Sequence, residues 1–182
     1  MWNGTLRTGV TALGMPSSNA TLAAAATITY SGTTTITLNG NFMNVTTRNA
    51  SGNADVTTNN VPIPDNTVIY VRTHATTGCS RVELPTAPNY TTHDGCPNVF
   101  VQGTYSKDIT IGSDKDIIVV GDIQRTRAGS TPVDVELGMI ATSYVRIKHP
   151  VNSSGNNATG TMDDVDIEAA IMSVQHSFIV DN

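Results

Sequence analysis

Short apolar stretches separated by polar turns dominate the second half of the chain. From residue 98 onward each stretch is three to seven residues long, and several are centred eight to ten residues apart. Such lengths are typical of strands and too short for an ordinary helix. The stretches are residues 99–101, 109–111, 117–120, 137–141, 144–147, 165–171 and 177–180. This spacing predicts a chain that winds around a buried core with one short strand in each wall, as in a right-handed parallel β-helix.

A β-sandwich is the alternative, because its strands would give apolar stretches of similar length. A sandwich usually contains more hairpin turns, and residues 98–182 contain no Asn-Gly pair. We therefore expect an all-β protein whose second half is a parallel β-helix-like stack of short strands.

The first half of the chain has a different pattern. Residues 15–26 begin with cap-forming residues and continue in alanines, which predicts a short helix. Residues 35–45 predict a hairpin with a type I′ turn at Asn39-Gly40. The polar residues 46–60 are expected to form a loop or an irregular strand pair, and the apolar run 66–71 predicts a buried strand.

Two regions follow from this change of pattern. Residues 1–97 are expected to form a capping region with a helix, a hairpin and long loops. Residues 98–182 are expected to form the β-helical coils, with a polar loop at 152–164 that projects from them. The two regions are interpreted as one continuous domain.

Composition supports the β class and narrows the function. The chain has 28 Thr and 16 Asn among its 182 residues, and these types favour strands and turns. Ten Lys and Arg face 15 Asp and Glu, so a nucleic-acid-binding protein with a basic surface is not expected. The sequence contains no Gly-rich phosphate loop and no nucleophile-elbow motif. We therefore predict a non-enzymatic protein without a cofactor.

A polar but weakly charged composition is typical of exported proteins. No run of 18 apolar residues could span a bilayer, and the first residues lack the features of a signal peptide. We expect an extracellular or cell-surface location, with any membrane attachment made through a segment that this chain does not contain.

Cys79 and Cys96 both lie in turn-rich sequence. In an exported protein an even number of cysteines favours a disulfide, which would contribute about 3 kcal/mol here; two reduced thiols are the alternative. A zinc site is not expected, because these cysteines and the nearby His93 lack a fourth ligand.

Asn-X-Ser/Thr triplets make N-glycosylation a possibility. There are seven, of which the Thr and Ser content alone predicts about four, so the enrichment is weak. The candidate asparagines are Asn3, Asn19, Asn44, Asn49, Asn89, Asn152 and Asn157.

The densest acidic group is a weak candidate for a calcium site. It consists of Asp163, Asp164, Asp166 and Glu168. On a strand, Asp166 and Glu168 would share the outward face, where carboxylates could equally be ordinary solvated side chains. A carbohydrate-active site would require basic residues beside these acids, and Arg146 and Lys148 share one face of their own predicted strand.

Several blocks, in a constant order from about residue 13 to the end, carry a family resemblance. They include Met-Pro-Ser-Ser-Asn at 15–19, Thr-Thr-Thr-Ile-Thr-Leu-Asn at 33–39, Val-Ile-Tyr-Val at 68–71, Asp-Gly-Cys-Pro-Asn-Val-Phe-Val-Gln-Gly-Thr-Tyr-Ser at 94–106, Asp-Ile-Ile-Val-Val-Gly-Asp-Ile at 116–123, Leu-Gly-Met-Ile-Ala at 137–141 and His-Ser-Phe-Ile-Val-Asp-Asn at 176–182. These blocks resemble bacterial surface proteins, common in actinobacteria, that often begin with a pilin-like hydrophobic segment. The resemblance implies a secreted or envelope-anchored β-helical region linked to type IV pilus-like systems, without catalytic residues. This chain lacks the hydrophobic segment and stops where relatives usually continue, which suggests a fragment or a variant.

The function predicted from sequence is therefore structural: a pilus-like filament, surface presentation or adhesion. Its expected partners are further copies of itself, other envelope or pilus proteins, and surface glycans. A carbohydrate-active or carbohydrate-binding β-helix is the alternative.

Overall fold

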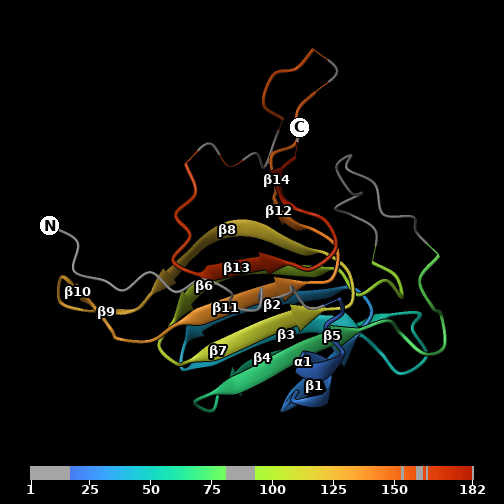
Figure 1. Ribbon diagram of the computed structural model, residues 1–182, viewed down its shortest axis with the longest axis horizontal. Coiled ribbons are helices and arrows are strands. Elements are labelled where there is room, and N and C mark those ends of the chain that lie inside the picture. The colour runs from blue at the N-terminus through green and yellow to red at the C-terminus, as the bar shows by residue number, and fades with distance from the viewer. Residues whose placement is uncertain (1–16, 81–92, 153, 159–161, 163, 182) are drawn as a thin grey trace, which may run out of the picture.

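Strands make up most of the described structure, and the single helix in it is short. The computed structural model describes residues 17–80, 93–152, 154–158, 162 and 164–181 (Figure 1). The predicted all-β class is confirmed.

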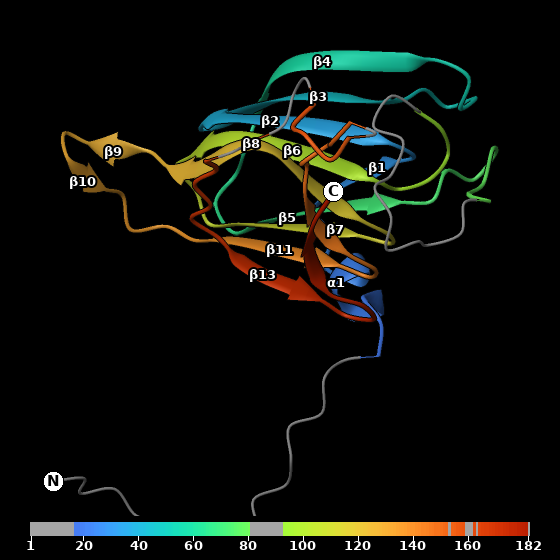
Figure 2. The same ribbon diagram turned by 90° about the horizontal axis from the view of Figure 1, so that it is seen from above.

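Two large sheets enclose the core, and Figure 2 shows them as an upper layer, with β2 to β4, and a lower layer, with β5, β7, β11 and β13. The five-stranded sheet has, in spatial order, β1 (Ile28–Ser31), β5 (Thr67–Arg72), β7 (Ile109–Ser113), β11 (Leu137–Ala141) and β13 (Ala170–Ser173). The seven-stranded sheet has, in spatial order, β14 (Phe178–Val180), β12 (Val145–Ile147), β8 (Ile117–Arg125), β6 (Val99–Tyr105), β2 (Thr34–Gly40), β3 (Phe42–Arg48) and β4 (Asp55–Pro62). A small antiparallel pair, β9 (Arg127–Ala128) and β10 (Thr131–Pro132), projects from one side.

The chain passes back and forth between the two large sheets. Strands β1, β5, β7, β11 and β13 belong to one sheet, and β2, β6, β8, β12 and β14 belong to the other. Neighbours among these strands are parallel within each sheet, whereas β2, β3 and β4 pair antiparallel. The seven-stranded sheet is therefore mixed, and a closed parallel β-helix is not confirmed for the chain as a whole.

Strand register aligns core side chains in columns. In the five-stranded sheet Ile111 of β7 pairs with Ile69 of β5 on one side and with Met139 of β11 on the other. None of these three side chains has exposed surface. Paired positions on adjacent strands point to the same face of a sheet, so these side chains stack on one another. The buried cluster contains Ile36 as well as Val145, so one core includes residues from both regions defined from sequence.

The hairpin forms where it was predicted, but its turn is shifted by one residue. Asn39 pairs with Phe42, so the two turn residues are Gly40 and Asn41. Gly40 has a φ of 61°, and Asn41 is not left-handed. A positive φ at the first position alone is the requirement of a type II′ turn, and the predicted type I′ turn at Asn39-Gly40 is wrong.

Other elements follow the sequence with changed limits. The predicted helix is the five-residue α1 (Ala20–Ala24). Residues 46–60 contain the end of β3 and most of β4, which pair antiparallel with a bulge. Within the stretch 165–171, only Ala170 and Ile171 belong to a strand, although Ile167 makes an isolated parallel bridge to Ile123. The described part of the loop at 152–164 projects from the sheets in Figure 1.

Candidate functional site

The last strand of each sheet leaves core-facing apolar side chains in contact with solvent. Phe178 pairs with the fully buried Val145, yet it is 47% exposed. Val180, in the next core-facing position of β14, is 52% exposed, and Ile171 of β13 is 36% exposed. We call this surface, made by Ile171, Phe178 and Val180, the open end. The apolar stretches 165–171 and 177–180 were expected to face a buried core, and for these three residues that expectation is wrong.

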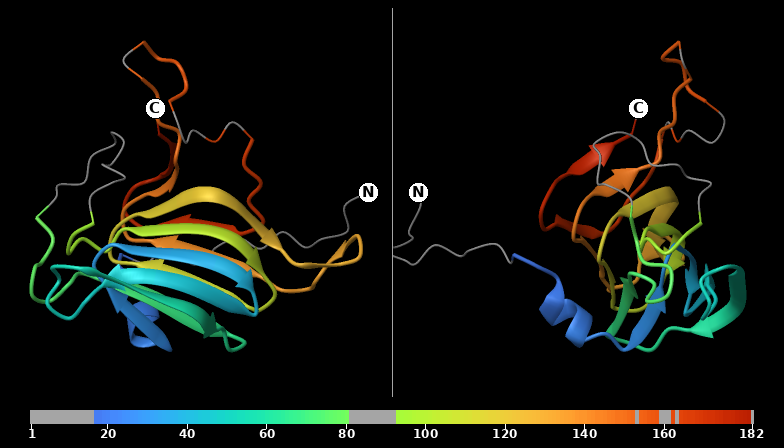
Figure 3. Two further views of the ribbon diagram at one scale, coloured as in Figure 1. Left: turned by 180° about the vertical axis from the view of Figure 1, so that it is seen from behind. Right: turned by 90° about the vertical axis from the view of Figure 1, so that its right-hand side faces the viewer.

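The opposite end of the molecule is covered by more chain. In the right-hand view of Figure 3, β13 and β14, in red, lie across the molecule from β3 and β4, in cyan to green. There β3 and β4 extend the seven-stranded sheet, and Met43, Val45 and Ile63 are buried. The edge strand β4 exposes Thr and Asn side chains together with Val56, and β3 exposes Phe42. Asp55 of β4 binds Arg48 and His93, so this end carries charged groups. The two ends therefore differ in chemistry.

A buried ion cluster underlies the open end. The Arg146 guanidinium on β12 donates to Asp116 at 2.9 Å and to Asp181 at 2.7 Å. Its charge also lies 4.6 Å from the centre of the Tyr144 ring, which stacks on His176. Burial raises the pKa of Asp116, and the nearby Arg146 only partly opposes this effect. The cluster links the residue before β8, strand β12 and the segment after β14.

The structure does not gather the calcium candidates into a cation site. Glu168 accepts bonds from the Arg125 backbone N–H at 2.7 Å and from Arg127 Nη2 at 3.0 Å. The backbone N–H of Arg125, reinforced by both guanidinium groups, lowers the pKa of Glu168. Gln124 binds Asp166 instead, and Asp164 is exposed. Among the described residues no group of three or more His, Cys, Asp or Glu could hold a metal, and Asp163 lies outside them.

The basic residues considered for a carbohydrate-active site lie elsewhere. Arg146 binds Asp116 and Asp181, not Asp166 or Glu168. The arginines that do bind Glu168, Arg125 and Arg127, were not identified from sequence. Their separation from Glu168 by more than 40 residues leaves no local signal for the contact.

Two adjoining cavities cross the starts of the strands in the five-stranded sheet. Their volumes are about 330 and 340 Å³, and both are lined by Glu136, Leu137 and Ala170. Asp108 lines the first cavity, and Arg125 lines the second. Asp108 also accepts a 2.8 Å hydrogen bond from the backbone N–H of Glu136. This bond links the residues that immediately precede β7 and β11.

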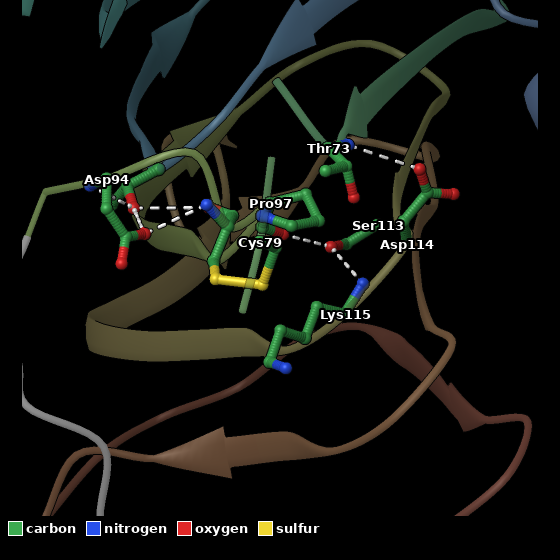
Figure 4. The surroundings of a disulfide bond; sticks show 9 residues. Thr73, Cys79, Asp94, Pro97, Ser113, Asp114 and Lys115 are labelled. Atoms are coloured by element: carbon green, nitrogen blue, oxygen red, sulfur yellow. Dashed lines mark hydrogen bonds between the residues drawn. A yellow bond between two sulfur atoms is a disulfide. The ribbon is translucent and has the colours of Figure 1, made fainter. Parts of the chain in front are cut away.

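Cys79 and Cys96 are joined by a disulfide (Figure 4). Cys96 is 1% exposed, and its backbone N–H donates to Asp94 Oδ1 at 2.9 Å. The next residue, Pro97, accepts a bond from the Ser113 hydroxyl at the end of β7. The two cysteines are therefore paired in the structure, as the first of the two alternatives predicted. Their disulfide fixes a loop that is itself bound to the five-stranded sheet.

The described glycosylation candidates differ in accessibility. Asn19 is 6% exposed, and its Nδ2 donates to Ser113 O, Ile140 O and Thr142 Oγ1, so this candidate is wrong for the folded chain. Asn44 and Asn49 are half-buried and hydrogen-bonded, whereas Asn152 and Asn157 are exposed. Asn3 and Asn89 lie outside the described residues.

Comparison with protein-family models, with curated proteins and with solved structures finds no match for this chain. Within the part of the chain that the structure describes, no helix is long and apolar enough to cross a membrane.

Proposed function

We propose that this chain is a non-enzymatic structural protein of the cell surface or extracellular space, which assembles with other protein through the open end. The single observation that carries the proposal is the exposure of Ile171 and Phe178 at positions that continue the buried Met139 and Val145, together with the exposure of Val180 further along β14. Apolar side chains so placed gain free energy when another chain covers them.

The open end also carries unpaired backbone groups. Strands β13 and β14 are the last members of their sheets, so one side of each has no neighbour among the described strands. Natural proteins usually protect such edges with charges, proline or a covering segment, because an unprotected edge pairs with other strands. This pattern favours assembly over catalysis as the function.

The proposed location is supported by the disulfide. Disulfides persist in oxidising compartments and are rare in the cytosol, where thiols are kept reduced. The buried Cys96 sulfur makes Cys79–Cys96 a structural link rather than an exposed reactive pair.

The proposed architecture is a right-handed parallel β-helix-like stack with an antiparallel extension at its first end. Alternation of successive strands between two sheets, and parallel pairing within each, support it. Such a stack can use its side faces for surface presentation while its open end makes contacts.

Cell-surface labelling of the source cells tests the proposed location and redox state. We expect a membrane-impermeant amine reagent to label the protein on intact cells, and Cys79 and Cys96 to resist alkylation until a reductant is added. Labelling only after cell lysis, together with two freely alkylated cysteines, would contradict the proposal.

Binding of a carbohydrate is the second candidate function, and the two adjoining cavities favour it. Carboxylates from Asp108 and Glu136 and the guanidinium of Arg125 offer hydrogen-bond acceptors and donors suited to sugar hydroxyls. Calorimetry with neutral and acidic polysaccharides, with and without calcium, tests this candidate. Binding that is lost in Glu136→Gln but kept in Asp164→Asn would support it, and the absence of binding would reject it.

A further inference from the structure

We propose that the open end binds the open end of a second copy of this chain, giving a closed two-fold dimer. This inference rests on the proposed function, because it names the partner for the surface described there. Three properties of the open end identify the partner: its apolar columns, its two strand edges that have no neighbouring strand among the described residues, and the absence of charged residues from Ala169 to Val180.

The apolar columns require an apolar partner. Val145 and Ile117 lie directly beneath Phe178 in the register and are fully buried. Ile171 continues the column of Met139 in the other sheet. Both columns thus reach the open end together, and a covering chain must place apolar side chains over both at once.

The strand edges require a partner with two edges at a matching separation. Strands β13 and β14 end their respective sheets and are separated only by residues 174–177. A second copy presents the same two edges at the same separation. A two-fold rotation would set β13 and β14 beside strands of the other copy and satisfy backbone groups in both sheets.

The charge distribution is compatible with an identical partner. From Ala169 to Val180 the chain has no Asp, Glu, Lys or Arg, so two open ends meet without like-charge repulsion from these segments. The opposite end has the hydrogen-bonded Arg48, Asp55 and His93 on and beside its edge. That end also exposes Phe42 and Val56, but on β3 and β4, the strands that carry Arg48 and Asp55. A head-to-tail contact would place these charged groups against Phe178 and Val180, which favours a closed dimer over a filament.

Sedimentation velocity over a wide range of protein concentration tests the dimer. We expect the wild-type chain to pass from monomer to dimer as concentration rises and to form no larger species. The contact involves two short strands, so we expect a weak association in the class of small, transient interfaces.

Matched substitutions test the surface. Val180→Lys on the open end should weaken dimerisation by about tenfold or more, whereas Val56→Lys on β4 should leave it within about twofold of wild type. The two valines have similar exposure, 52% and 48%, and both lie on edge strands. Phe178→Ser and Phe42→Ser form a second pair, with exposures of 47% and 46%. Melting curves of all four variants separate loss of dimerisation from loss of folding.

Three results would overturn the inference: a wild-type monomer at every concentration, assembly beyond the dimer, or equal weakening by the substitutions at both ends. A monomeric chain that is nevertheless labelled on intact cells would reject the dimer while leaving the proposed function in place. A chain found inside cells with free thiols would reject the proposed function, whatever its oligomeric state.

Discussion

Arg146 and Asp181 form a hydrogen-bonded ion pair of 2.7 Å in which both side chains are almost fully buried, at 1% and 0% exposure. Asp181 follows β14, whereas Arg146 lies on β12, so the pair joins the last strand of the seven-stranded sheet to its neighbour. Because β14 has only three residues and one neighbouring strand, its position depends strongly on this contact. The open end therefore rests on a buried polar cluster.

Replacing Arg146 should destabilise the protein severely. Arg146→Met would leave Asp116 and Asp181 buried without their shared cation, and such a loss costs about 3–5 kcal/mol. Urea unfolding monitored by circular dichroism measures the cost. Arg127→Met is the matched control, since Arg127 makes a 3.0 Å ion pair with Glu168 at 41% exposure and should contribute less than about 1 kcal/mol. Equal costs for the two variants would contradict the assigned role of the buried cluster.

Asp116 should make the folded state relatively more stable in acid. Burial raises its pKa above the ordinary aspartate value, with Arg146 opposing the shift. Its contribution to the free energy of unfolding is therefore fully present below the ordinary pKa and declines as pH rises through the raised pKa. Asp116→Asn cannot ionise, so its stability relative to wild type should improve as pH rises from below the ordinary aspartate pKa toward neutrality. Urea midpoints across this range measure the trend, and a constant difference would contradict it.

Glu168 should show the opposite dependence on pH. The backbone N–H of Arg125, with help from the Arg127 and Arg125 side chains, lowers its pKa. Its contribution to stability is present above the ordinary glutamate pKa and is lost as pH falls through the lowered pKa. Glu168→Gln should therefore be less stable than wild type at neutral pH and approach wild type in acid. Urea unfolding at neutral and at acidic pH measures the difference. The exposed Asp164 supplies the control, because Asp164→Asn should follow the wild-type unfolding curve under both conditions.

Much of the strand pattern was predictable because it depends on local sequence. Apolar runs such as 109–111 and 117–120 lie in β7 and β8, where both faces of the strand are largely buried. The turn at Gly40 was placed one residue away from its true position, because an Asn-Gly pair indicates a turn but does not determine strand register.

The sequence did not reveal which apolar residues remain exposed. Phe178 and Val180 have the pattern of a core strand, and their exposure depends on whether another strand lies beyond β14. Arg146 was expected only to share one strand face with Lys148. Its side chain is 1% exposed, and its partners Asp116 and Asp181 come from positions 30 and 35 residues away. Burial of a charged side chain by distant partners has no local sequence signal.

Reduction of the Cys79–Cys96 disulfide should destabilise the protein without unfolding both sheets. The disulfide closes a loop with a sequence separation of 17, for which the loss of constraint on the unfolded chain predicts a cost of about 3 kcal/mol. Urea unfolding with and without a thiol-free reductant measures this cost, and Cys79→Ala/Cys96→Ala serves as the control because it should not respond to reductant.

Hydrogen exchange after reduction should increase first around residues 94–98. Asp94 binds Cys96 within this loop and Thr33 outside it. The bond from Ser113 to Pro97 holds the same loop against the five-stranded sheet. An unchanged wild-type midpoint after reduction would show that the surrounding hydrogen bonds hold the loop without the disulfide.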